Sequence, residues 1–61
     1  MYKNYEKILK KKKLTSYQVA KATGVSQSTL SDWKTGRSKP KIDKLIKIAD
    51  YLGVDVRLFI E

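Results

Sequence analysis

Apolar residues recur along this chain at the three- and four-residue spacing of short amphipathic helices. No stretch shows the strict alternation of a half-buried β-strand. We therefore predict an all-α fold, a compact bundle of five short helices in a single domain over residues 1–61. The predicted helical segments are about Asn4–Lys12, Ser16–Thr23, Gln27–Lys34, Lys41–Leu52 and a last turn over Val56–Ile60.

The same spacing predicts which side of each helix faces inward. We expect the core to include Tyr2, Tyr5, Ile8, Leu9, Val19, Ala20, Val25, Leu30, Trp33, Ile42, Leu45, Ile48, Ala49, Leu52, Val56 and Phe59. Asn4 is a candidate N-cap for the first helix. Trp33 admits a second interpretation, because exposed aromatic rings can stack on single-stranded bases. Its helical spacing from Leu30 favours the core position.

The most informative segment is residues 14–36, with the sequence LTSYQVAKATGVSQSTLSDWKTG. Thr15 is followed three residues later by Gln18, a capping-box pattern in which each side chain accepts a hydrogen bond from the other residue's backbone N–H. Ser26 is another favoured N-cap. These caps predict the starts of two helices within the segment.

The connection between these two helices is too short for anything but a tight turn. Gly24 can adopt the left-handed conformation that ends a helix. Ala20 is small enough for the second helix to cross close to the first, and Leu30 is placed to pack into the angle between them. We therefore predict a helix-turn-helix, whose second helix can present its outer face to a DNA groove.

The segment resembles the helix-turn-helix of phage-repressor-type regulators, the lambda repressor/Cro or XRE-like family. The resemblance continues through SDWKTGRSKPK and IDKLIKIADYLGVDVRLFI, so it covers about residues 5–60. It implies a sequence-specific regulator of transcription that binds double-stranded DNA, most simply a repressor occupying a palindromic operator. It also implies a weak homodimer formed chiefly on DNA. Tyr51, Leu58 and Ile60 are candidates for the dimer contact, or else ordinary surface and core residues.

The resemblance also indicates which side chains contact DNA. The predicted base-reading residues are Ser26, Gln27, Ser28, Ser31 and Asp32. Gln27 can bond both N6 and N7 of adenine, and Asp32 can accept a hydrogen bond from the cytosine amine. For Asp32, solvation or an ion pair with a nearby lysine is the alternative. The predicted phosphate-binding residues are Ser16, Tyr17, Gln18, Thr29, Thr35, Gly36 through its amide, Arg37, Ser38 and Lys39.

The chain departs from the family pattern at several positions. Lys13 stands where relatives usually have glycine, which carries a backbone cost if the turn needs a positive φ. Leu9 and Lys34 replace an Arg–Glu pair common in relatives, and we expect Leu9 to pack beside Trp33 and the stem of Lys34 instead. Ser16 replaces a glutamine that braces the DNA backbone and the recognition helix. We also expect a poorly capped fourth helix, because relatives often have Ser or Thr at the position of Lys41.

The charge of the chain favours a polyanionic partner. It has 14 Lys and Arg against 6 Asp and Glu, a net charge of +8. The run Lys10–Lys13 either complements the negative end of its helix or contacts phosphate. The chain has no Cys and no His, which excludes disulfides and the common zinc sites. We predict no catalytic residues, no metal and no cofactor. No apolar run approaches the roughly 20 residues of a membrane span, so we expect a cytoplasmic protein with no membrane partner.

Two other function classes remain open from the sequence. One is an antitoxin-like or other protein-interaction module, in which Gln27–Asp32 contact a protein. The other is a binder of nucleic acid or of a membrane surface that works by charge alone. The first predicts only weak, non-specific affinity for DNA, and the second predicts that binding does not depend on the duplex sequence.

Overall fold

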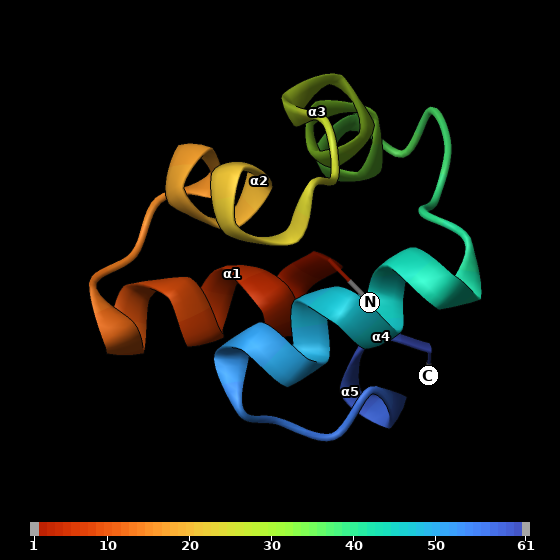
Figure 1. Ribbon diagram of the computed structural model, residues 1–61. Coiled ribbons are helices and arrows are strands. Elements are labelled where there is room, and N and C mark those ends of the chain that lie inside the picture. Colours follow the sequence, from red (N-terminus) through yellow and green to blue (C-terminus); the bar gives the residue numbers. More distant parts are fainter. Residues whose placement is uncertain (1, 61) are drawn as a thin grey trace.

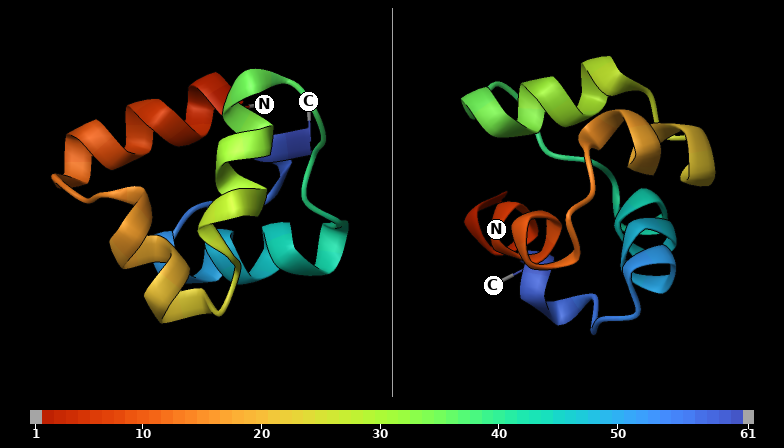
Figure 2. Two further views of the ribbon diagram at one scale, coloured as in Figure 1. Left: turned by 90° about the horizontal axis from the view of Figure 1, so that it is seen from above. Right: turned by 90° about the vertical axis from the view of Figure 1, so that its left-hand side faces the viewer.

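The computed structural model describes residues 2–60, which form the five helices α1 (Tyr2–Lys12), α2 (Ser16–Thr23), α3 (Gln27–Thr35), α4 (Ile42–Leu52) and α5 (Arg57–Ile60) (Figure 1). No strand occurs among these residues, and the predicted all-α bundle is confirmed. In Figures 1 and 2, α2 and α3 lie on one side of the molecule, while α4 and α5 lie on the other. This arrangement leaves the outer side of α3 uncovered by the other described helices.

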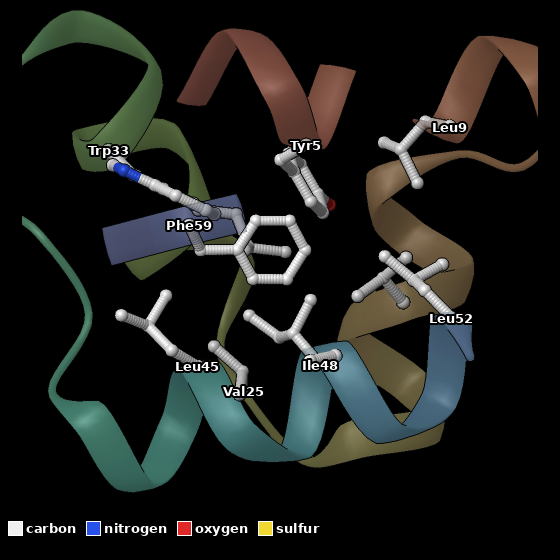
Figure 3. Close-up of a cluster of buried hydrophobic side chains, with 11 residues drawn as sticks. Tyr5, Leu9, Val25, Trp33, Leu45, Ile48, Leu52 and Phe59 are labelled. Carbon is white, nitrogen blue, oxygen red and sulfur yellow. The ribbon is translucent and has the colours of Figure 1, made fainter. Parts of the chain in front are cut away.

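The core lies where the apolar sides of all five helices meet (Figure 3). Its buried members are Tyr5, Leu9, Val19, Val25, Leu30, Trp33, Leu45, Ile48, Ala49, Leu52 and Phe59. The ring centroids of Tyr5 and Trp33 are 5.1 Å apart, and those of Trp33 and Phe59 are 5.7 Å apart. Trp33 is only 6% exposed, so it is a core residue and not a platform for bases.

The predicted capping role of Asn4 and the predicted burial of Ile42 are both wrong. The first helix begins at Tyr2, so Asn4 lies inside it and is not its N-cap. The Asn4 side-chain amide instead donates to the Leu58 carbonyl oxygen at 2.7 Å, which joins α1 to α5. Ile42 was expected in the core but is 53% exposed. It has the correct helical phase but is the first residue of α4, at the edge of the core.

The prediction that Leu9 packs beside Trp33 is also wrong. Tyr2 and Tyr5 of α1 contact Trp33, with ring centroids 5.4 and 5.1 Å from it. Leu9 is buried at the opposite end of the cluster shown in Figure 3. The C-terminal end of α3 therefore packs on the first half of α1 through contacts between aromatic rings.

Left-handed residues follow the first four helices, which the sequence predicted for Gly24 and left open for Lys13. Lys13 follows α1 with a φ of 57°. Its N–H donates to the Lys10 carbonyl at 3.3 Å, and the Leu14 N–H donates to the Leu9 carbonyl at 2.9 Å. This pair of bonds defines a Schellman motif, in which glycine is the usual left-handed residue. At the N-terminus of α4, Lys41 occupies the N-cap position but makes no side-chain capping hydrogen bond, as predicted.

Candidate nucleic-acid interface

The turn between α2 and α3 is fixed by hydrogen bonds within the segment. Gly24 has a φ of 78°, and its N–H donates to the Ala20 carbonyl at 2.9 Å. The Thr23 hydroxyl donates to the Val19 carbonyl at 2.7 Å and accepts from the Val25 N–H at 3.3 Å. Val25 is buried, which anchors the turn to the core. The predicted helix-turn-helix is therefore present, with α2 and α3 joined by a tight turn.

The N-terminal turns of α3 present polar side chains to solvent. Gln27, Ser28 and Ser31 are exposed, and their side chains have no hydrogen-bond partner among residues 2–60. Asp32 is half-buried, and its carboxylate forms no ion pair with the cations in this part of the chain. Four of the five predicted base-reading residues thus have polar groups available to a ligand.

Ser26, the fifth predicted base-reading residue, already has a structural role. Its hydroxyl accepts from the Thr29 N–H at 3.1 Å and lies 2.9 Å from the Thr29 hydroxyl. Ser26 is therefore the N-cap of α3, as predicted. Thr29 was predicted to bind phosphate, but it is half-buried and its hydroxyl belongs to this cap. Contacts from these two hydroxyls to DNA must compete with the cap.

The beginning of α2 forms one flank of the interface. The capping box predicted here is present, because the Thr15 hydroxyl accepts from the Gln18 N–H at 3.2 Å and the Gln18 side-chain oxygen accepts from the Thr15 N–H at 2.8 Å. The Gln18 oxygen is thus engaged, whereas Tyr17 is 58% exposed. An α-helix leaves its first N–H groups without helical partners, and these groups together with the helix dipole attract phosphate.

The loop after α3 forms the other flank. The N–H of Gly36, which was predicted to bind phosphate, donates to the Trp33 carbonyl at 3.2 Å as the cap of α3, so a contact with phosphate must compete with this bond. The N–H groups of Arg37 and Ser38 donate to the Asp32 carbonyl at 2.9 and 3.3 Å. The N–H groups of residues 36–38 therefore bond to the end of α3, and the exposed side chains of the loop are its remaining donors to phosphate.

The exposed cations of this loop form no salt bridge with an acidic residue among residues 2–60. Arg37, Ser38 and Lys39 are exposed. Among residues 2–60 the one salt bridge is between Arg57 and Asp55, with Nη2 and Oδ2 2.8 Å apart. Thr35 is also exposed, although its hydroxyl donates to the Asp32 carbonyl at 3.2 Å. Arg37 and Lys39, two of the three cations in this loop, are therefore available for phosphate.

Sequence reasoning missed the hydrogen bond that holds Ser16 to α1. The Ser16 hydroxyl lies 3.1 Å from the hydroxyl of Tyr5, a contact between residues on different helices. Burial raises the pKa of Tyr5 above the usual value for a phenol, although the hydrogen bond from Ser16 opposes that shift. The pattern predicted Tyr5 as a core residue, but no local signal identifies the partner of its hydroxyl.

A comparison with known protein families supports this interpretation of the geometry. The family model described as Helix-turn-helix matches residues 6–59. The chain belongs to the XRE-type helix-turn-helix family. The match includes the complete α2–turn–α3 unit and extends into α1 and α5 on either side. Comparisons with curated proteins and with solved structures gave no significant match.

Membership of the XRE-type helix-turn-helix family places the chain among DNA-binding regulatory domains. Within residues 2–60, no helix is long and apolar enough to cross a membrane.

Proposed function

We propose that this XRE-type domain is a sequence-specific regulator of transcription that binds double-stranded DNA and represses by occupying an operator. The observation that carries the proposal is the exposed polar face of α3. Gln27, Ser28 and Ser31 have no side-chain partner among residues 2–60, although they lie on a helix whose other face is buried. An α-helix fits the major groove, where each base pair presents a distinct set of donors and acceptors.

The chemistry of these side chains limits which bases they can read. The Gln27 amide has one acceptor and two donors, which match N6 and N7 of adenine. Ser28 and Ser31 can donate or accept. A charged Asp32 carboxylate is acceptor-only, so it favours the cytosine amine and disfavours base edges that present acceptors. The face as a whole thus favours some base sequences and opposes others.

The flanks supply affinity that does not depend on sequence. The first turn of α2 offers backbone N–H groups to one phosphate, with Tyr17 beside it. The side chains of Arg37 and Lys39 supply cations on the other flank. Each phosphate neutralised by such a cation releases condensed counterions. The net charge of +8 attracts DNA before any base is read.

Binding as a two-fold dimer on a palindrome is part of the proposal. In helix-turn-helix dimers, half-sites lie one turn of DNA apart, about 34 Å. Tyr51, Leu58 and Ile60 each remain more than 40% exposed. These exposed apolar side chains belong to α4 and α5, which lie on the other side of the molecule from α3 (Figure 1). A contact through these few side chains is consistent with a dimer that forms mainly on DNA.

Selection of binding sites from random duplexes tests the proposal, followed by a salt titration on the selected site and on a scrambled duplex. We expect a palindromic site, bound at least about 10³-fold more tightly than the scrambled duplex. Equal binding to both duplexes with strong salt dependence would indicate attraction by charge alone. Affinity no better than about 10⁻⁴ to 10⁻⁶ M for every duplex would indicate a protein-interaction module instead.

A further inference from the structure

Tyr5 connects α1 to both helices of the helix-turn-helix. Its side chain is completely buried. The ring packs against Trp33, near the C-terminal end of α3, with a centroid distance of 5.1 Å. The hydroxyl lies 3.1 Å from the hydroxyl of Ser16, the first residue of α2. One side chain therefore contacts the helix that carries the base-reading face and the helix that begins at the phosphate flank.

The surroundings of the Tyr5 ring leave it little freedom to move. Tyr2 packs on it with a centroid distance of 5.4 Å, and Phe59 does so at 6.2 Å. Figure 3 shows Tyr5 between Trp33 and Leu9, on the side of the cluster next to α1. Because the Tyr5 ring is packed on several sides, the position of its hydroxyl is fixed. The hydrogen bond to Ser16 lies in a poorly solvated environment, where it is stronger than the same bond in water.

The hydrogen bond acts on the part of α2 that offers N–H groups to phosphate. A bond to Ser16 restrains the side chain and the backbone of this first turn. Preorganisation of this kind lowers the conformational entropy lost when a ligand binds. Tyr5 itself is buried, so it can influence DNA only through the residues that it holds in place.

We propose that Tyr5 is a positioning residue for DNA binding, which fixes the first turn of α2 relative to α3 through its hydrogen bond to Ser16. This inference rests on the proposed function. The phosphate flank and the base-reading face then keep the separation and orientation that a DNA groove and its backbone require. A role confined to stability predicts a lower melting temperature for Tyr5→Phe but unchanged DNA binding by the folded protein.

The test compares Tyr5→Phe, Ser16→Ala and the double variant with the wild type. Dissociation constants are measured on the selected duplex and on a scrambled duplex, at a temperature where circular dichroism shows every variant folded. We expect Tyr5→Phe to weaken binding by about 2- to 10-fold on both duplexes, the equivalent of one net hydrogen bond. The preference between duplexes and the salt slope should not change, because no base-reading group and no cation is removed.

The double variant and a matched control separate positioning from stability. The effect of Tyr5→Phe should largely disappear in the Ser16→Ala background, because the two hydroxyls act through one bond. Tyr2→Phe is the control. It removes a hydroxyl from the same aromatic cluster, one that has no hydrogen-bond partner among residues 2–60, and it should leave binding unchanged.

Wild-type affinity for both duplexes in folded Tyr5→Phe would overturn the inference while leaving the proposed function intact. A wild-type protein without preference for any duplex would instead overturn the proposed function. If Tyr5→Phe does not fold, the test passes to Ser16→Ala and Ser16→Thr, which leave the aromatic cluster complete. Weaker binding by Ser16→Ala, with near-normal binding by Ser16→Thr and with lower backbone NMR order parameters at residues 16–18 of free Ser16→Ala than of the free wild type, supports the inference. Normal binding by Ser16→Ala overturns it.

Discussion

Replacing Lys13 by glycine should stabilise the protein by about 1 kcal/mol. Lys13 has a φ of 57° in the Schellman motif that ends α1. A left-handed backbone costs a residue with a Cβ roughly 1 to 2 kcal/mol, whereas glycine adopts it freely. The substitution also removes a cation near the negative end of α1, an interaction worth about 0.3 to 1 kcal/mol. Because three other lysines remain in the last turn, we place that loss at the lower end.

Thermal and urea unfolding followed by circular dichroism measure this effect. A change of about 1 kcal/mol corresponds to roughly 4 to 8 °C in melting temperature for a domain of this size. Lys10→Gly is the matched control, because it removes the same charge from a residue of the last turn that lies inside α1. There glycine should cost roughly 0.5 to 1 kcal/mol. A melting temperature that falls equally in both variants would refute the strain argument.

Four further predictions concern recognition and stability. Gln27→Ala should cost about 1 to 3 kcal/mol on the selected site and relax the preference at one base pair; an equal loss on every duplex would exclude a base-reading role. Arg37→Ala should weaken binding to all duplexes and lower the salt slope by about one, and an unchanged slope would remove this residue from the phosphate contacts. Thr15→Ala removes the capping box with Gln18 and should lower the unfolding free energy by about 1 kcal/mol; no change in urea unfolding would contradict this. Burial raises the pKa of Tyr5 above its unfolded value of 10.0, so the buried neutral phenol makes its full contribution to the unfolding free energy below pH 10. This contribution is lost as the pH rises through the folded-state pKa. Stability measured above pH 10 should therefore fall less steeply in Tyr5→Phe than in the wild type, and parallel curves would contradict the shift.

The features that the sequence predicted correctly depend on residues close together in the chain. The capping box of Thr15 and Gln18 is set by two side chains within one helical turn. Gly24 takes its left-handed conformation because it ends a helix whose length follows from its own apolar spacing. The five helices and the turn between α2 and α3 were predictable for the same reason.

The features that the sequence missed depend on which helices meet. Ile42 has the right helical phase but lies where the core ends, and the phase alone does not show where that is. The hydrogen bond between Tyr5 and Ser16 joins two helices, so it needs their relative placement. Gly36 ends α3 in a left-handed conformation, in which its N–H donates to the helix, and the predicted phosphate contact did not anticipate this bond.

If the exposed polar face of α3 contacts the bases, the residues of that face must sense the bound duplex. NMR spectra of the ¹⁵N-labelled protein, recorded during titration with the selected duplex, measure this. We expect the largest shifts on the amides and side chains of residues 27–32, with a second group at residues 16–18, and we expect that the scrambled duplex does not reproduce the first group. Unchanged signals at 27–32, with the largest shifts on α4 and α5, would contradict it.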